Sequence, residues 1–232
     1  MVYTKATKPR AVTNRIDELQ KGVVRGDARA MYALAYHLST QPDAEVHRKR
    51  CIELLKSAAA KGDRRAQYAI GTWYLYGTGV RKNYKVASSY LLASAKQGYA
   101  PAQYNFAVSL TRGKGVEQNK KHAFGWYRKA ATQGDRDARR ELARCYFLGI
   151  GVKRDERQSA LWARKAARQG DAESQYELAA CYEAGMGVKQ SLKRAVIWYQ
   201  KAATQGYEEA RAALKDLGDL PADYADSVKQ SA

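Results

Sequence analysis

The sequence is poor in the residues that build disulfides and metal sites. It has three cysteines and three histidines among 232 residues. Three cysteines are too few, and odd in number, for a disulfide framework, and they fit a reducing cytoplasm, where we expect the protein to reside. No histidine stands at metal-ligand spacing with another histidine or a cysteine, so neither a metal nor a cofactor is expected.

Long apolar runs are also missing. No stretch approaches the roughly 18–20 apolar residues that are needed to span a bilayer. Residues 1–12 are basic but lack the apolar segment of a secretory signal. The sequence therefore predicts no membrane partner. Its hydrophobic content of 45 % is nevertheless enough to bury a core, which excludes a wholly disordered chain.

Acidic residues are few compared with basic ones. The chain has 23 Asp and Glu against 41 Lys and Arg, which gives a formal net charge of +18. An excess of this size bears on partners and solubility rather than on the fold.

Glycine, in contrast, recurs at a constant step of 36 residues. One series consists of Gly26, Gly62, Gly98, Gly134, Gly170 and Gly206. A second series consists of pairs with one residue between them, each followed by valine: Gly77 and Gly79, Gly113 and Gly115, Gly149 and Gly151, Gly185 and Gly187. Several independent series at one step indicate a repeat protein.

Each repeat has the pattern of two helices. In residues 64–76, Ala66, Ile70 and Tyr74 share one helical face, and a second helix is predicted over about 84–97. The Gly-x-Gly-Val segment ends the first helix, because glycine tolerates the left-handed conformation that closes a helix. We therefore interpret the eight glycines of these pairs as structural turns. One helix pair cannot bury its apolar face alone, so neighbouring repeats must stack.

The repeat also predicts how the chain is divided. A basic, disordered segment is expected at 1–12 and a capping helix at 13–27. Five repeats are expected at 28–63, 64–99, 100–135, 136–171 and 172–207, followed by a capping helix at 208–220 and a frayed acidic tail at 221–232. The first repeat lacks Gly-x-Gly, and its interhelix turn is expected at Pro42 and Asp43.

The repeat resembles a known family. Residues 172–207 contain Glu-Leu-Ala-Ala-Cys-Tyr at 177–182, Gly-Met-Gly-Val at 185–188 and Trp-Tyr-Gln-Lys-Ala-Ala-Thr-Gln-Gly at 198–206. This pattern resembles the Sel1-like repeats, relatives of tetratricopeptide repeats, over roughly residues 28–217. The resemblance implies an all-α, right-handed superhelix whose first helices line a concave groove. It also implies adaptor work rather than catalysis.

A search for chemistry finds no catalytic residue. The Gly-x-Gly pairs are not phosphate loops, because none opens a helix after a strand and no Gly-Lys-Ser/Thr occurs. Cys145 and Cys181 occupy one repeat position in consecutive repeats, where first helices about 9–10 Å apart exclude a disulfide. They are interpreted as small buried residues. No arrangement of a nucleophile with histidine is present, so the chain is predicted not to be an enzyme.

Positive charge is concentrated in the middle three repeats, which hold +15 of the +18, and residues 64–99 contain no acid. Tyrosine stands at one repeat position throughout, except that arginine replaces it at 140. These features predict partner-binding residues on the first helices: Arg65, Tyr68, Tyr104, Arg140, Arg144 and Tyr176. Two alternatives stay open: the arginines serve solubility and pair with Asp137 and Glu141, and the tyrosines pack between repeats.

The predicted function is a non-enzymatic scaffold that holds an acidic segment of another protein along the groove. The alternative is a nucleic-acid-associated protein that uses the basic middle repeats. No nucleic-acid-binding fold or aromatic RNA-binding motif supports this alternative.

Overall fold

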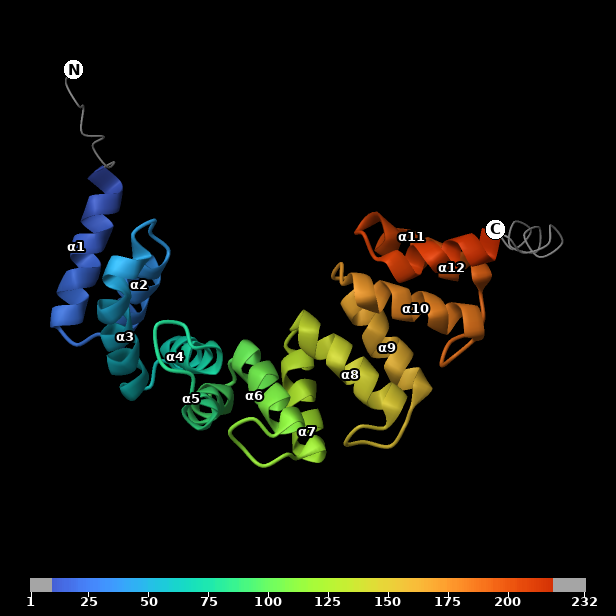
Figure 1. The fold of residues 1–232 in the computed structure, drawn as a ribbon, viewed down its shortest axis with the longest axis horizontal. Coiled ribbons are helices and arrows are strands. Elements are labelled where there is room, and N and C mark those ends of the chain that lie inside the picture. Colours follow the sequence, from blue (N-terminus) through green and yellow to red (C-terminus); the bar gives the residue numbers. More distant parts are fainter. Residues whose placement is uncertain (1–9, 219–232) are drawn as a thin grey trace, which may run out of the picture. The chain divides into compact units, whose positions relative to one another are not determined.

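The computed structural model describes residues 10–218, and every secondary-structure element in that range is a helix (Figure 1). The helices are α1 (Arg10–Val24), α2 (Ala28–Ser39), α3 (Ala44–Ala60), α4 (Arg64–Tyr76), α5 (Tyr84–Lys96), α6 (Ala100–Arg112), α7 (Lys120–Thr132), α8 (Arg136–Leu148), α9 (Glu156–Ala167), α10 (Ala172–Ala184), α11 (Leu192–Thr204) and α12 (Glu208–Gly218). The predicted all-α fold of helix-pair repeats is confirmed.

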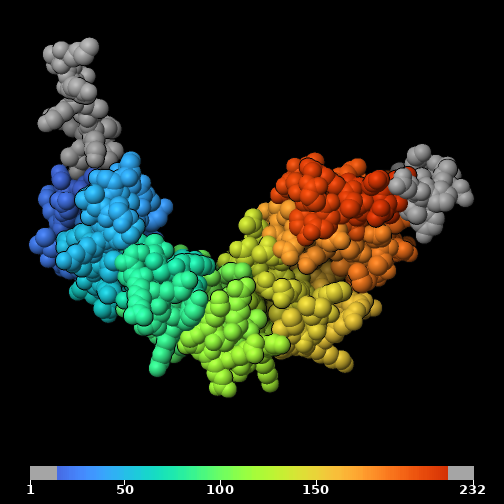
Figure 2. Space-filling model, viewed as in Figure 1, coloured from blue at the N-terminus to red at the C-terminus, as the bar shows by residue number. Residues whose placement is uncertain are grey.

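The chain divides into two compact units, residues 1–117 (unit 1) and 118–232 (unit 2). Within each unit, neighbouring helix pairs pack directly on one another (Figure 2). The helix before the first repeat begins at Arg10 rather than at residue 13. The predicted acidic tail at 221–232 lies outside the described residues, as does most of the basic segment predicted at 1–12.

The first glycine of each Gly-x-Gly pair ends a first helix. Gly77, Gly113, Gly149 and Gly185 are the C-caps of α4, α6, α8 and α10, with φ between 66° and 83°. The amide of Gly77, for example, donates to the carbonyl oxygen of Trp73 at 2.8 Å. The first repeat has no such glycine: α2 ends at Ser39, and α3 begins after Asp43, whose side chain makes no capping hydrogen bond.

The second glycine of the pair has a role that the sequence does not reveal. A Cβ at Gly115, Gly151 or Gly187 would lie only 2.0–2.2 Å from a carbonyl oxygen at the start of the preceding repeat's second helix. At Gly151, that oxygen belongs to Lys120. Glycine is therefore needed here for close packing between repeats as well as for its positive φ of 66–74° in the four pairs.

A glutamine on three of the first helices also links consecutive repeats. The Nε2 atoms of Gln67, Gln103 and Gln175 donate to carbonyl oxygens near the end of the preceding second helix, at 3.1–3.2 Å. In the fourth repeat, Arg139 Nε makes the corresponding bond to the carbonyl of Ala131 at 3.1 Å. Each first helix from α4 to α10 is thereby fixed to the backbone of the repeat before it.

The core between the helices consists mostly of alanines and single large aliphatic side chains. Ile70, Leu142 and Leu178 are fully buried at the same repeat position. Cys145 and Cys181 are buried, free thiols, and burial raises the pKa of each to about 11. They therefore act as small packing residues at neutral pH.

We predict that Gly151→Ala lowers the free energy of unfolding by about 2–4 kcal/mol, because strained backbone and the clash with the Lys120 carbonyl act together. Gly170→Ala is the matched control, with φ +88° and no atom within 4 Å of its Cβ position. It should cost about 1–2 kcal/mol from strain alone. Urea unfolding of both variants checks this; equal losses would show that the close approach does not matter.

Candidate binding surface

Four positions on each first helix form a stripe that faces solvent. On α4 they are Arg65, Tyr68, Thr72 and Tyr76, spaced so that they share one helical face, and all are half-buried or exposed. We call the equivalent residues of each first helix its outer stripe. Because the core and the turns use other positions, the outer stripe is free to differ between repeats.

The outer stripes of unit 1 carry arginine and tyrosine. Helices α2, α4 and α6 contain no acidic residue. Tyr36 and Tyr76 are 61 % and 66 % exposed, which is unusual for large aromatic side chains. Arg29 is exposed near the start of α2, and Arg112 is exposed at the end of α6.

The repeated tyrosines also contact neighbouring repeats. The centroid of the Tyr32 ring lies 4.5 Å from the guanidinium of Arg65 in the second repeat, and the Tyr68 hydroxyl accepts a hydrogen bond from Asn105 Nδ2 of the third repeat at 3.3 Å. Tyr68 and Tyr176 also contact Tyr99 and Tyr207 at the ends of their own repeats, with ring centroids 5.2 and 5.3 Å apart. Tyr104 is half-buried at the equivalent position. Tyr32 and Tyr68 thus contact the next repeat, and all four tyrosines of the series are half-buried.

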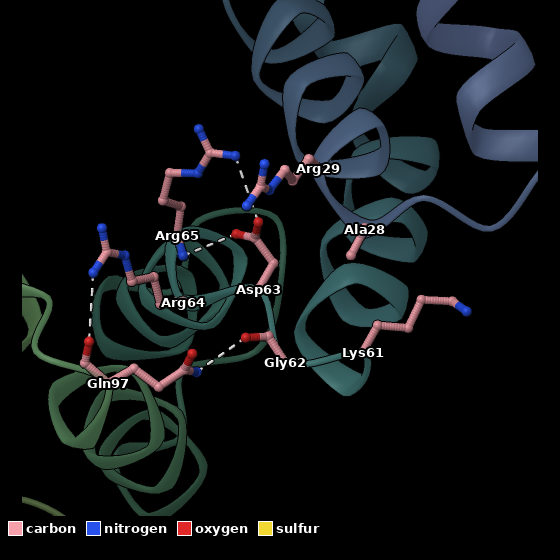
Figure 3. A pocket seen from close by; sticks show the side chains of 8 residues that line it. All are labelled: Ala28, Arg29, Lys61, Gly62, Asp63, Arg64, Arg65 and Gln97. Carbon is pink, nitrogen blue, oxygen red and sulfur yellow. Dashed lines mark hydrogen bonds and ion pairs between the residues drawn. The ribbon is translucent and has the colours of Figure 1, made fainter.

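A recess opens between the first two repeats (Figure 3). Its volume is about 630 Å³, and it is lined by Ala28, Arg29, Lys61, Gly62, Asp63, Arg64, Arg65 and Gln97. Four of these side chains are cationic, and only Asp63 is acidic. The Asp63 carboxylate caps α4 by accepting hydrogen bonds from the amides of Arg65 and Ala66, both at 2.9 Å.

The four cations of the recess have few internal partners. Arg65 reaches the Asp63 carboxylate at 3.5 Å, and Arg64 donates to the carbonyl of Gln97 at 3.4 Å. The side chains of Arg29 and Lys61 make no hydrogen bond or ion pair with any of residues 10–218. The recess therefore has a net positive charge that the surrounding described residues do not neutralise.

Arg140, which breaks the tyrosine series, lies in a different environment. Its guanidinium is 2.8 Å from the Asp171 carboxylate, 3.3 Å from that of Glu173 and 3.8 Å from that of Asp137. The Asp171 side chain is 6 % exposed and caps α10 through the amide of Ser174. Arg140 thus links the fourth repeat to the fifth, in line with the ion-pair alternative. Arg144, one turn further along α8, is exposed.

Helix α10 is acidic, whereas α4 is basic. It contains Glu173, Glu177 and Glu183 and no basic residue. Burial, with repulsion from Glu173 and Asp171, raises the pKa of the Glu177 carboxyl from 4.5 to about 7, against the opposing effect of Arg140. Glu177 makes no hydrogen bond or ion pair within the described part of the chain.

Residues 10–218 contain neither a candidate metal site nor a candidate membrane span. No group of three or more His, Cys, Asp or Glu residues there could hold a metal ion. No helix in that range is long and apolar enough to cross a membrane.

Sequence reasoning found Arg65 but missed Arg29, Lys61 and Arg64. The signal was present for Lys61, because glutamine occupies its repeat position at 97, 133, 169 and 205. Asp137 was expected as a partner of Arg140, whereas Asp171 and Glu173, at the end of the fourth repeat and the start of the fifth, were not.

The comparisons with known proteins agree with the repeat. The family model described as Sel1 repeat matches residues 28–63, 64–99, 100–135, 136–171 and 172–207. No curated protein matches the chain.

Solved structures share the fold. A protective antigen of uropathogenic Escherichia coli strains, which displays an SLR fold, is 29 % identical, with a TM-score of 0.83 over 88 % of this chain and 44 % of that one. This chain therefore spans less than half of the E. coli protein. A Sel1 repeat protein from Oxalobacter formigenes is 29 % identical, with a TM-score of 0.73 over 82 % of this chain and 78 % of that one.

We predict that Arg140→Ala lowers the free energy of unfolding by about 1.5–3 kcal/mol, because the nearly buried Asp171 carboxylate loses its nearest cation and keeps Arg136 only at 3.8 Å. Arg144→Ala, the same substitution at an exposed site of the same helix, should change it by less than about 0.5 kcal/mol. Thermal and urea unfolding measure both. Equal stabilities of the two variants would argue against a structural role for Arg140.

The raised pKa of Glu177 predicts a pH dependence. The folded protein binds more protons than the unfolded chain between pH 4.5 and about 7, so this group makes stability fall as pH rises through that window. We expect Glu177→Gln to stabilise the fold by about 1–3 kcal/mol at about pH 8, and by less at about pH 5. Urea unfolding at both pH values tests this, with the exposed Glu209→Gln as control; a gain independent of pH would contradict it.

Proposed function

Because this chain belongs to the Sel1 repeat family, whose members generally mediate protein–protein interactions, we propose that it is a non-enzymatic scaffold that holds an acidic segment of another protein against its first helices. One observation carries this proposal. Helices α2, α4 and α6 present arginines and exposed tyrosines and contain no acidic residue.

The residue types suit such a partner. Tyrosine and arginine are the residues that most often contribute strongly to protein interfaces. The planar guanidinium of arginine binds a carboxylate through two parallel hydrogen bonds, which a lysine cannot do. Arg65 is held over the Tyr32 ring at 4.5 Å, so less freedom is lost when it binds a partner.

The charges on the first helices support unit 1 as the proposed place of contact. Arg65, Tyr68 and Tyr104 lie on outer stripes of unit 1 and remain proposed contact residues. Arg140 already pairs with three carboxylates of this chain, so it is not among the partner contacts that we propose. Arg144 and Tyr176 stay proposed contacts in unit 2, but the three glutamates of α10 would repel an acidic segment there.

We predict that the double variant Tyr36→Ser/Tyr76→Ser loses a protein partner that the wild type captures from native lysate. Both rings are mostly exposed, so folding should be unaffected, while affinity should fall roughly tenfold or more if they are interface residues. The capture is measured with and without nuclease, and the partner should survive nuclease treatment.

Arg157→Glu, an exposed charge reversal on the second helix α9, is the matched control and should keep the partner. Equal capture by the wild type and the tyrosine variant would show that the unit 1 stripes are not the binding surface. Material that is captured only without nuclease would favour the nucleic-acid alternative.

A further inference from the structure

The recess between the first two repeats is unlike the same place elsewhere in the chain. Its Arg64 and Arg65 correspond to Ala100 and Pro101 in the next repeat. At the following junctions the same two positions hold Arg136 and Asp137, Ala172 and Glu173, and Glu208 and Glu209. The repeat alone therefore does not require this charge, because the same backbone positions accept neutral and acidic pairs.

Lys61 departs from the repeat in a way that removes a structural bond. At the equivalent position, the Nε2 atoms of Gln97 and Gln169 donate to the carbonyl oxygens of Gly62 and Gly134, at 3.0 and 2.9 Å. Lys61 makes no such bond within the described residues. The first repeat thus has a lysine without an acidic partner in the described residues, where Gln97 and Gln169 bond to the repeat before them.

We propose that this recess binds the phosphate group of a phosphorylated segment on the partner protein, which rests on the scaffold function proposed above. Four cations and one carboxylate line the recess. A single carboxylate would leave two charges unneutralised, whereas a phosphate monoester carries nearly two negative charges and three strong acceptor oxygens. Arginine clusters are a recurrent means of recognising such groups.

The contacts would come from side chains rather than from the helix N-terminus. The first free amides of α4, those of Arg65 and Ala66, already donate to Asp63. Arg29 and Lys61 have no internal acceptor for their side chains among residues 10–218, and Arg64 donates only to a carbonyl. These three groups can turn toward an incoming anion without breaking an ion pair.

The shape of the recess favours a group carried on a larger segment. It is open to solvent and its lining is polar (Figure 3). Small free ligands are usually held in deeper, mostly apolar pockets that bury most of their surface. A phosphorylated side chain needs only its charged tip to be covered, because the rest of the partner lies on the neighbouring outer stripes.

The test uses one short acidic peptide in three versions, with serine, phosphoserine or glutamate at its central position, and inorganic phosphate as a fourth probe. Affinities are measured by isothermal titration with the full chain. The phosphoserine peptide should bind at least roughly tenfold more tightly than the other two peptides. Inorganic phosphate should bind more weakly than the phosphoserine peptide, because it lacks the contacts of the flanking residues.

The variant Arg29→Ala/Lys61→Gln tests the recess itself. Lys61→Gln introduces the residue that later repeats carry, so the fold should tolerate it. The preference for phosphoserine over serine should fall by roughly tenfold or more. Lys85→Ala removes an exposed positive charge from the second helix α5 of the same unit, outside both the recess and the outer stripes, and should leave the preference unchanged.

A pH series distinguishes phosphate from carboxylate recognition. The second pKa of a phosphate ester is about 6, so binding of the phosphoserine peptide should weaken as pH falls from about 7.5 to about 5.5. The glutamate peptide stays ionised over this range. The charged groups of the recess are Arg29, Lys61, Arg64, Arg65 and the capping Asp63, and no histidine lines it.

Two outcomes would overturn the proposal while the scaffold function stands: equal binding of the phosphoserine and glutamate peptides, or an unchanged phosphoserine preference in the recess variant. Inorganic phosphate that binds as tightly as the phosphoserine peptide would also overturn it, because the recess would then be a site for the free anion. Failure of the scaffold proposal would be seen separately, in unchanged partner capture by the tyrosine variant.

Discussion

The structure depends on the close stacking of each helix pair on the one before it, because a single pair leaves its apolar face exposed. Two backbone contacts set the spacing. The second glycine of each later turn lies against the start of the preceding second helix, with no room for a Cβ. A glutamine or arginine then binds the carbonyl at that helix's other end. Both contacts require the constant step of 36 residues.

The same constraint explains where the chain can vary. Core, turn and linking positions are used in the same way in the last four repeats, so differences there gather on the outer stripes and at the repeat junctions. There the charge of the first helix changes sign: α4 carries two arginines and no acidic residue, whereas α10 carries three glutamates and no basic residue. A uniform acidic ligand would match the first and not the second. For the proposed scaffold, we therefore expect partner selectivity to be set by individual repeats.

The sequence predicts the parts of the structure that repeat, because a periodic residue reports a local requirement. The left-handed C-caps at Gly77 and Gly149 and the helix pairs around them follow from the glycine series alone. It predicts the pairing of Arg140 with Asp137 but not with Asp171 and Glu173, since these two carboxylates approach Arg140 only when α10 lies beside α8. Arg65 is likewise recognisable from the acid-free composition of its repeat. Its recess is not, because residues of two stacked repeats form it.

Net charge is a weak guide to the partner of this protein. Part of the excess serves the fold: Lys129, Lys165 and Lys201 recur every 36 residues and lie 3.8–4.5 Å from the rings of Trp126, Trp162 and Trp198. Such cation–π contacts follow the repeat and carry no information about a ligand. Arg29 and Lys61, which have no acidic partner among residues 10–218, gather with Arg64 and Arg65 in one recess. This argues for recognition of one anionic group rather than of an extended polyanion, for which many phosphate contacts along the surface would be needed.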